Sequence, residues 1–152
     1  DPGHAAALNA LGIAYARAGR TKDALGSFAK ILAVRPRDVQ ALENVGTVHL
    51  QQRAWPSAEA AFRAALLVEP RASRAHAGLG VIALQRGRRD EAIAHWQDAV
   101  TMDPRNFDAL FNLATELVNA GRFADARGQN SGVVEEGFQQ KVRNFLTAPG
   151  AI

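Results

Sequence analysis

The chain has 152 residues, of which 47% are hydrophobic and 22% are charged, with a formal net charge of +3 and no cysteine. This length suits one domain with a sizeable core, and the lack of cysteine excludes disulfides and thiolate metal sites. No apolar run approaches the roughly 20 residues that a membrane-spanning helix needs, and so small a net charge argues against a nucleic-acid or membrane partner.

The chain repeats itself every 34 residues. Four prolines mark the period: Pro2, Pro36, Pro70 and Pro104. A framework of Leu, Gly, Ala and one aromatic residue recurs between them, at Leu11, Gly12, Ala24 and Phe28, then Val45, Gly46, Ala58 and Phe62, then Leu79, Gly80, Ala92 and Trp96. A fixed period of this length is typical of stacked-repeat proteins.

Within each repeat the apolar spacing predicts two helices. In the first repeat, residues 5–18 form one helix, Gly19 ends it, and Thr21 caps a second helix that ends before Pro36. Small residues at Gly12 and Ala24 indicate where the paired helices cross closely. In later repeats we expect Pro56 to open a helix and Ser73 to cap one.

The repeats divide the chain into consecutive units: 1–4 as the remnant of a preceding repeat, then 5–38, 39–72, 73–106 and 107–137. The fourth unit has a degenerate second helix, since Asn130 replaces the aromatic residue and Phe138 replaces the proline. We favour a capping helix and tail over 138–152, because terminal repeats are atypical where a stack ends. In the alternative, 128–138 is an inserted loop and 139–148 is the displaced end of the repeat.

The pattern Leu-x-x-Leu-Gly-x-x-Tyr at Leu8–Tyr15, followed by Ala24, Phe28 and Pro36, resembles the tetratricopeptide repeat family. The resemblance implies an all-α, right-handed solenoid of antiparallel helix pairs with an irregular C-terminal end. First helices line a concave groove and second helices form the convex back. It also implies that the groove binds a peptide or protein segment.

Carrying the family's groove columns onto this chain selects a mixed surface, neither strongly basic nor strongly acidic. Its members are Asn9, Ile13, Arg17, Gln40, Glu43, Asn44, Thr47, Gln51, Arg74, Ala77, Val81, Gln85, Asp108, Phe111, Asn112 and Thr115. Asn44 and Asn112 share one column, in which Ala10 and Gly78 alternate with them. Either these amides hold the backbone of an extended peptide, or Asn is simply common there and faces water.

Two other features, the carboxylate-clamp positions and the recurring arginines, are weak evidence for a ligand. The family's receptors for carboxylate-ended tails use five residues, and the matching positions keep only Asn44 and the charge of Arg74, which is too few for that clamp. Arginine also recurs in two rows: Arg37, Arg71 and Arg105, and Arg20, Arg88 and Arg122. They either form basic edges for an acidic partner or, as we favour, sit in solvent beyond helix C-termini, where cations are stabilised.

Nothing in the sequence indicates catalysis or a cofactor. The four histidines, His4, His49, His76 and His95, lack metal-ligand spacing, and His49 and His76 occupy framework columns that favour packing. We therefore expect a non-enzymatic interaction module without metal or cofactor, with a protein or peptide ligand. The alternatives are an accessory domain of a larger enzyme and a scaffold that self-associates through exposed solenoid ends.

Origin and compartment are only weakly indicated. Abundant Ala, with Arg greatly outnumbering Lys, is typical of a bacterial genome rich in GC. The sequence leaves the compartment undetermined, with a soluble cytoplasmic protein slightly favoured. The similarity of residues 1–4 to the last turn of a repeat leads us to expect that the chain begins inside a longer array.

Overall fold

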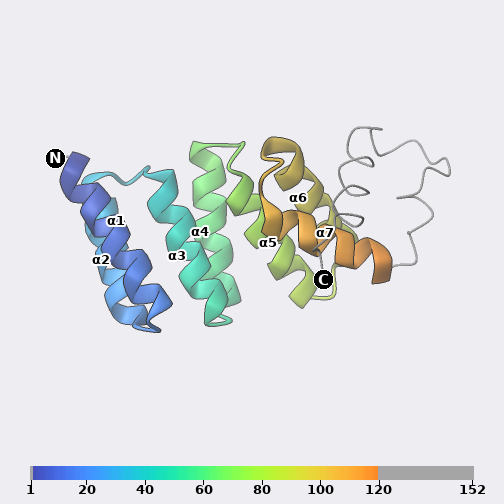
Figure 1. Cartoon of the computed structure of the whole chain (residues 1–152), viewed down its shortest axis with the longest axis horizontal. Helices are drawn as coiled ribbons and strands as arrows, with labels where there is room; N and C mark the ends of the chain where they lie inside the picture. Colours follow the sequence, from blue (N-terminus) through green and yellow to red (C-terminus); the bar gives the residue numbers. More distant parts are fainter. Residues whose placement is uncertain (1, 120–152) are drawn as a thin grey trace, which may run out of the picture.

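A computed structural model describes residues 2–119, and every regular element within that range is an α-helix (Figure 1). Pairs of helices follow one another along the long axis of the molecule. In chain order they are α1 (Pro2–Arg17), α2 (Thr21–Val34), α3 (Val39–Gln51), α4 (Trp55–Val68), α5 (Ser73–Gln85), α6 (Arg89–Met102) and α7 (Phe107–Asn119). The all-α repeat architecture expected from the 34-residue period is confirmed.

The turn inside each repeat uses the same backbone conformation three times. Gly19 and Gly87 have φ of 72° and 74°, and Arg53, which occupies the same column of the repeat, has φ of 57°. Positive φ ends a helix in the left-handed conformation that glycine adopts without cost. The two glycines are therefore the helix stops that the sequence predicts, whereas Arg53 holds this conformation against its own preference.

The predicted caps at Thr21 and Ser73 are wrong. Both residues are the first residue of their helix, and no cap hydrogen bond comes from the side chain of the residue before either one. The Ser73 hydroxyl instead donates to the carbonyl of Ala99, at 2.8 Å. The caps that form lie at the junctions between repeats, where Asp38 accepts from the Ala41 N–H and Asn106 accepts from the Ala109 N–H, both at 3.0 Å.

In each of the first three repeats, an aromatic ring packs against a glycine of the paired helix. A Cβ placed on Gly12 would lie 2.6 Å from the Phe28 ring, and one on Gly46 would lie 2.6 Å from the Phe62 ring. At Gly80 the same atom would lie 2.5 Å from the indole of Trp96. The predicted close crossing of paired helices is thus confirmed, and it explains why this column holds glycine in the first three repeats.

Neighbouring repeats share their cores. Phe62 of α4 also faces Gly78 of α5, in the next repeat, where a Cβ would collide with the ring. The first helices of adjacent repeats contact each other as well, α1 with α3, α3 with α5, and α5 with α7. The side chains of α1, α3, α5 and α7 therefore form a continuous surface that crosses all four repeats.

The repeat boundaries drawn from the prolines fall between helix pairs, in the links after α2, α4 and α6. Residues 2–4, which the spacing assigns to a preceding repeat, lie in the first turn of α1. The expected second helix of the fourth repeat, the capping helix over 138–152 and the alternative loop over 128–138 lie outside the described residues. Among residues 2–119, no helix is long and apolar enough to cross a membrane.

Candidate functional site

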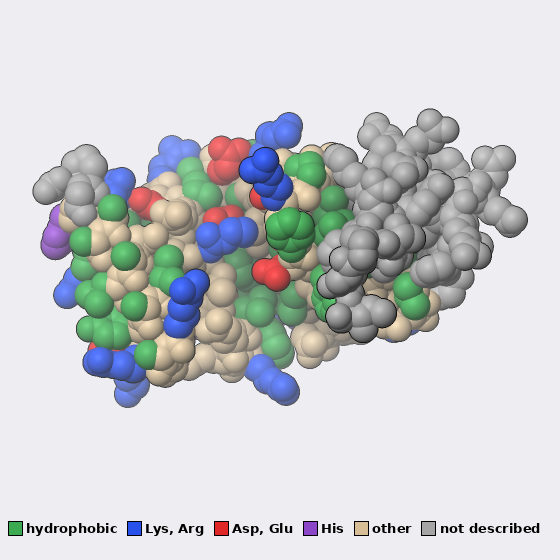
Figure 2. Space-filling view, viewed as in Figure 1, with side chains coloured by type: hydrophobic (Ala, Val, Ile, Leu, Met, Phe, Trp, Pro, Cys, Tyr) green, Lys and Arg blue, Asp and Glu red, His purple; other side chains and the backbone are tan. Residues whose placement is uncertain are grey.

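All sixteen predicted groove residues lie on first helices, and we call the surface that they mark the first-helix face. Asn9, Ile13 and Arg17 are on α1, the five from Gln40 to Gln51 are on α3, the four from Arg74 to Gln85 are on α5, and the four from Asp108 to Thr115 are on α7. Acidic, basic and apolar side chains are interspersed over the side of the molecule seen in Figure 2.

Four of these residues form one polar network across three repeats. Asn44 Nδ2 donates to Asn9 Oδ1 at 2.7 Å, and Arg74 Nη2 donates to Asn44 Oδ1 at 2.6 Å. Arg74 Nε lies 3.7 Å from Glu43 Oε2. The Asn44 side chain is therefore held from both sides, and it fixes the guanidinium of Arg74 in turn.

The members of this network differ in burial. Asn44 and Glu43 are only 6% and 8% exposed, whereas the side chain of Arg74 is 49% exposed. Burial raises the pKa of the Glu43 carboxyl, and the nearby Arg74 charge and a backbone hydrogen bond from Ala75 offset only part of that rise. Arg74 is thus the member that can contact a ligand.

Several predicted groove residues serve the fold instead. Ile13 packs against the core of the first repeat, and Ala77 and Val81 pack against the cluster around Trp96. The Thr47 and Thr115 hydroxyls donate to backbone carbonyls four residues earlier, at 2.9 and 2.8 Å. These residues are less available to a ligand than the family columns suggest.

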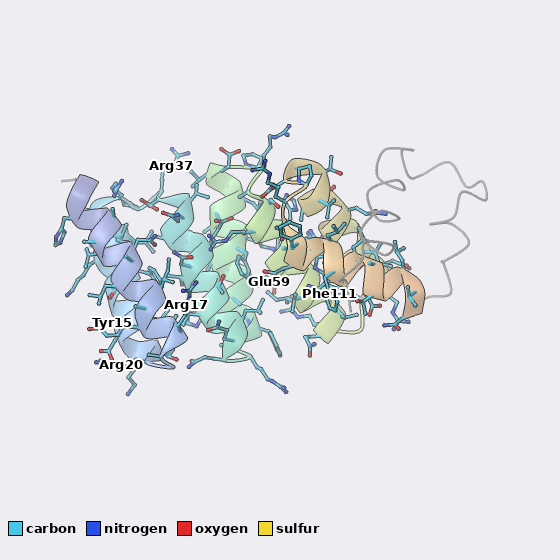
Figure 3. All side chains as sticks on the ribbon, viewed as in Figure 1. Tyr15, Arg17, Arg20, Arg37, Glu59 and Phe111 are labelled. Atoms are coloured by element: carbon cyan, nitrogen blue, oxygen red, sulfur yellow. The ribbon has the colours of Figure 1, made fainter. Side chains whose placement is uncertain are left out.

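The members that project into solvent are spread along the whole face. Phe111 on α7 is 59% exposed, and Arg17 on α1 is also exposed. Figure 3 shows them on first helices at opposite ends of the described row. The exposed polar members between and beside them are Gln40, Gln51, Arg74, Gln85, Asp108 and Thr115.

The expected asparagine column is interrupted for a physical reason. Gly78 lies between Asn44 and Asn112 in the repeat pattern, and any side chain there would collide with Phe62. Asn44 does not face water, because it is buried and bonded to two neighbours, while Asn112 is half-buried. The structure therefore has one buried asparagine, Asn44, where a regular column would place an asparagine in every repeat.

In one of the two arginine rows, Arg20 and Arg88 pair with acidic residues in the first turn of the following helix. Arg20 pairs with Asp23 at 2.8 Å and lies 4.5 Å from the centre of the Tyr15 ring, and Arg88 pairs with Glu91 at 2.7 Å. Figure 3 shows Arg20 and Arg37 at opposite ends of the helices. These pairings favour the solvent-facing interpretation of that row, whose third member, Arg122, lies outside the described residues.

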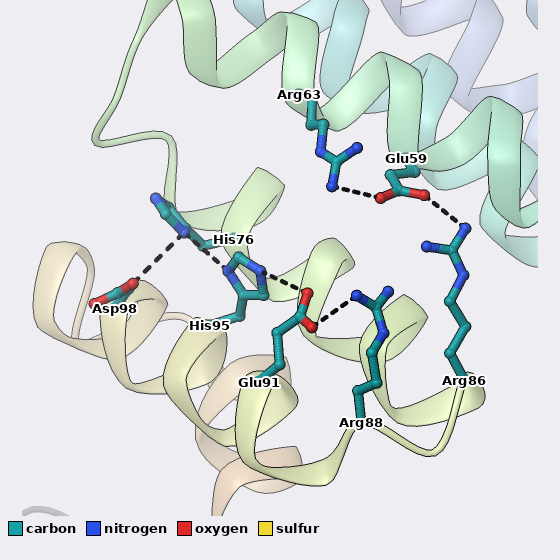
Figure 4. Close-up of polar contacts among 8 residues, drawn as sticks. All are labelled: Glu59, Arg63, His76, Arg86, Arg88, Glu91, His95 and Asp98. Atoms are coloured by element: carbon teal, nitrogen blue, oxygen red, sulfur yellow. Dashed lines mark hydrogen bonds and ion pairs between the residues drawn. The ribbon is translucent and has the colours of Figure 1, made fainter.

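Sequence reasoning missed a cluster formed by His76, His95 and Asp98 (Figure 4). It treated His76 as a packing residue because that column normally holds an aromatic side chain. A usable signal was present, since His95 and Asp98 are three residues apart on one helix and therefore share a face. What it could not supply was the contact with His76, which comes from the preceding helix.

A sequence profile described as tetratricopeptide repeat matches the chain over residues 1–37, 9–66, 46–95 and 83–137. The chain belongs to the tetratricopeptide repeat family, whose members commonly act as protein-interaction modules. No curated protein sequence matches it significantly.

Solved structures agree with this fold. The crystal structure of MamA is 19% identical with a TM-score of 0.70, and the match covers 95% of this chain and 79% of that one. An O-GlcNAc transferase of Thermobaculum terrenum is 18% identical with a TM-score of 0.71, covering 93% of this chain but only 25% of the transferase. The first repeat domain of Spaghetti (RPAP3), solved with an HSP90 peptide, is 18% identical with a TM-score of 0.69, covering 80% and 96%. At these identities the likeness concerns the fold alone.

Proposed function

We propose that this chain is a non-catalytic interaction module that binds a peptide or protein segment along the first-helix face. The observation that carries the proposal is the network of Asn9, Asn44, Arg74 and Glu43, which links three successive first helices. Polar side chains that are held in place before binding lose little entropy when a ligand arrives. A network of this kind suits recognition better than a freely moving surface arginine does.

Arg74 supplies the directional contact in this proposal. Its Nη2 is committed to Asn44 and its Nε lies near Glu43, so the remaining guanidinium N–H groups are left for a ligand oxygen. These donors suit a peptide carbonyl or a side-chain carboxylate, because charge-assisted hydrogen bonds are the stronger ones. Exposed Phe111 adds an apolar contact further along the same face.

The ligand we propose is an extended segment without strong net charge. The Arg74 charge is already balanced by Glu43, and the rest of the face is mixed. The HSP90 peptide of the Spaghetti (RPAP3) structure shows that one similar fold binds a peptide. We do not extend that ligand to this chain, since only two of the five positions of the family's carboxylate clamp are retained and these two bond to each other.

The test is selection of peptides followed by affinity measurement. Random peptides displayed on phage are selected against the parent chain, and dissociation constants of the recovered peptides are measured by fluorescence anisotropy. We expect Asn44→Ala and Arg74→Ala to raise the dissociation constant about tenfold or more, or roughly 1.4 kcal/mol, as expected for loss of a charge-assisted contact. Arg74→Lys keeps the charge but loses the planar fork, so it should fall between them and the parent.

The matched control is Lys22→Ala, which removes an exposed cation from α2, a second helix. It should bind as the parent does, and far-ultraviolet circular dichroism should show all variants to be folded. Failure to recover any binding peptide, or equal affinity of the Arg74→Ala, Asn44→Ala and parent chains, would refute the proposal.

An accessory role in a larger enzyme is the second candidate. The observation favouring it is that the transferase match covers 25% of that chain, so a comparable fold there occupies only part of an enzyme. The reading frame that encodes this chain distinguishes the candidates: a catalytic domain in the same frame supports the accessory role, and its absence rejects it.

Self-association is the third candidate. A depression at the outer end of the first repeat, between α1 and α2, has an apolar floor with a basic rim, and Val34 is 80% exposed there. Its lining residues are Ala5, Leu8, Ile31 and Val34, with His4, Lys30 and Arg35. Sedimentation velocity over a range of concentrations tests it. A dimer that Val34→Glu dissociates supports association through this end, and a monomer at all concentrations rejects it.

A further inference from the structure

The third repeat brings two imidazoles and a carboxylate together on its α5–α6 pair (Figure 4). His76 Nδ1 lies 3.5 Å from His95 Nδ1 and 3.9 Å from Asp98 Oδ2, and the three ligand-type atoms all lie within 4.8 Å of one another. The two histidine side chains are largely buried, at 13% and 25% exposure, whereas that of Asp98 is 57% exposed.

The proton on His76 is fixed by the backbone. Its Nε2 lies 3.2 Å from the carbonyl oxygen of Pro70, which can only accept a hydrogen bond. Nε2 therefore carries the proton, and Nδ1 of the neutral ring presents a bare lone pair to His95. A histidine whose far nitrogen donates to a backbone carbonyl is oriented as metal-binding histidines are.

His95 then faces two conflicting demands. Its Nε2 lies 3.9 Å from Glu91 Oε1, and the nearby carboxylate favours a proton on Nε2. Its Nδ1 faces the unprotonated Nδ1 of His76, and that lone pair favours a proton on Nδ1 of His95 as well. Only the charged imidazolium satisfies both.

A bound cation removes this conflict. With an ion between the two Nδ1 atoms, each ring keeps one proton on Nε2, facing Pro70 on one side and Glu91 on the other. We propose that His76 Nδ1, His95 Nδ1 and an Asp98 carboxylate oxygen together bind one divalent transition-metal ion, for which Zn²⁺ is the best match.

The spacing suits an ion of that size. Ligands of a tetrahedral zinc ion with bonds of about 2.0–2.1 Å lie about 3.3–3.4 Å from one another. The two nitrogens are already at 3.5 Å, and the exposed Asp98 side chain is free to close the remaining gap. A water molecule takes the fourth position. Two imidazoles and one carboxylate suit zinc, nickel or copper, and they exclude magnesium and calcium, which prefer oxygen ligands alone.

Neighbouring charges leave the site open to a cation. The nearby Arg63 is engaged by Glu59 at 2.7 Å, and Arg88 is engaged by Glu91 at 2.7 Å (Figure 4). An ion here would tie α5 to α6. Because His76 also contacts Pro70, the ion would stiffen the link between the second and third repeats as well. The proposed consequence is a third repeat whose stability depends on metal.

The test is metal binding by the untagged full chain after removal of metal with EDTA. Zn²⁺ is titrated in competition with a chromophoric chelator, and the number of ions bound and the dissociation constant are measured for the parent, His95→Gln and Asp98→Asn. We expect one ion at this site in the parent and a loss of affinity of about 100-fold or more in His95→Gln, since even loss of a supporting residue costs about 10–100-fold. Asp98→Asn changes an exposed side chain, so it should stay folded while losing about tenfold.

The matched control is His49→Gln, which removes another partly buried histidine outside the cluster. It should bind zinc as the parent does, and Mg²⁺ should not compete. A second measurement is thermal unfolding, in which excess Zn²⁺ should raise the midpoint of the parent and of His49→Gln but not that of His95→Gln. The inference is overturned if the parent binds no zinc in competition with the chelator, or if folded His95→Gln and Asp98→Asn both bind it as tightly as the parent.

Discussion

The glycine at the centre of the solenoid offers the sharpest test of how the repeats pack. Gly46 on α3 faces Phe62, and a Cβ there would lie 2.6, 2.7 and 2.8 Å from three atoms of the ring. The ring cannot retreat, because it is 2% exposed and its other edge already meets Gly78. The substitution Gly46→Ala must therefore displace a helix or force the ring into a strained rotamer.

The expected cost follows from two opposing effects. Overpacking a well-filled core costs about 1–3 kcal/mol, while replacing a helical glycine by alanine gains roughly 1 kcal/mol in helix propensity. We therefore expect Gly46→Ala to lower the free energy of unfolding by up to about 2 kcal/mol. The matched control is Gly26→Ala on α2, where nothing lies within 4 Å of the new Cβ, and it should raise stability by about 0.5–1 kcal/mol.

Urea unfolding followed by circular dichroism measures both variants beside the parent. The two alanine variants should differ by about 1–3 kcal/mol, because both gain helix propensity and only Gly46→Ala overpacks the core. In a Phe62→Leu background, Gly46→Ala should cost less unfolding free energy than it does in the parent, because the smaller leucine leaves room for the added methyl group. Gly46→Ala as stable as Gly26→Ala would show that the helices do not cross as closely as we describe, and would refute this reasoning.

Three further changes test other parts of the structure. Arg53→Gly relieves a left-handed residue and should raise the free energy of unfolding by roughly 0.5–1 kcal/mol, which is a rise of about 1–4 °C in the thermal midpoint. Trp96→Phe removes the hydrogen bond from the indole to Ala77 O, at 3.1 Å, and should cost about 1–3 kcal/mol in urea unfolding. Glu59 has a pKa lowered chiefly by its hydrogen bond to Arg86, so its stabilisation is present above the unfolded value of 4.5 and is lost as pH falls through the lower folded pKa. Glu59→Gln should therefore be less stable than the parent at pH 7, by up to about 1 kcal/mol, with the gap closing as pH falls below 4.5; a constant gap would contradict this assignment.

The fold was predictable because the packing contacts between paired helices constrain the same positions in successive repeats. Gly12, Gly46 and Gly80 recur because an aromatic ring faces each of them, and this constraint is visible as a column of the sequence. The caps were not predictable in the same way. Thr21 and Ser73 are good capping residues by type, but the helices begin one residue earlier than a cap there would require, and other groups use their hydroxyls.

The sequence predicted which helices carry the candidate site, but not the contacts within it. The family columns place the sixteen residues on first helices, but they do not say which of them bond to one another. The link from Asn9 through Asn44 to Arg74 depends on how far adjacent repeats are rotated, and no spacing along the chain encodes that rotation. The histidine cluster was missed for a similar reason, since His76 and His95 meet only through the pairing of α5 with α6.

The most direct test of the central claim maps where a selected peptide binds. Such a peptide is titrated into the isotope-labelled chain, and the chemical-shift changes of backbone amides and of the Asn44 side-chain amide are followed by nuclear magnetic resonance. Our account predicts that the largest changes lie on α1, α3, α5 and α7 and include the Asn44 amide. Changes concentrated on α2, α4 and α6, with the Asn44 amide unmoved, would contradict it.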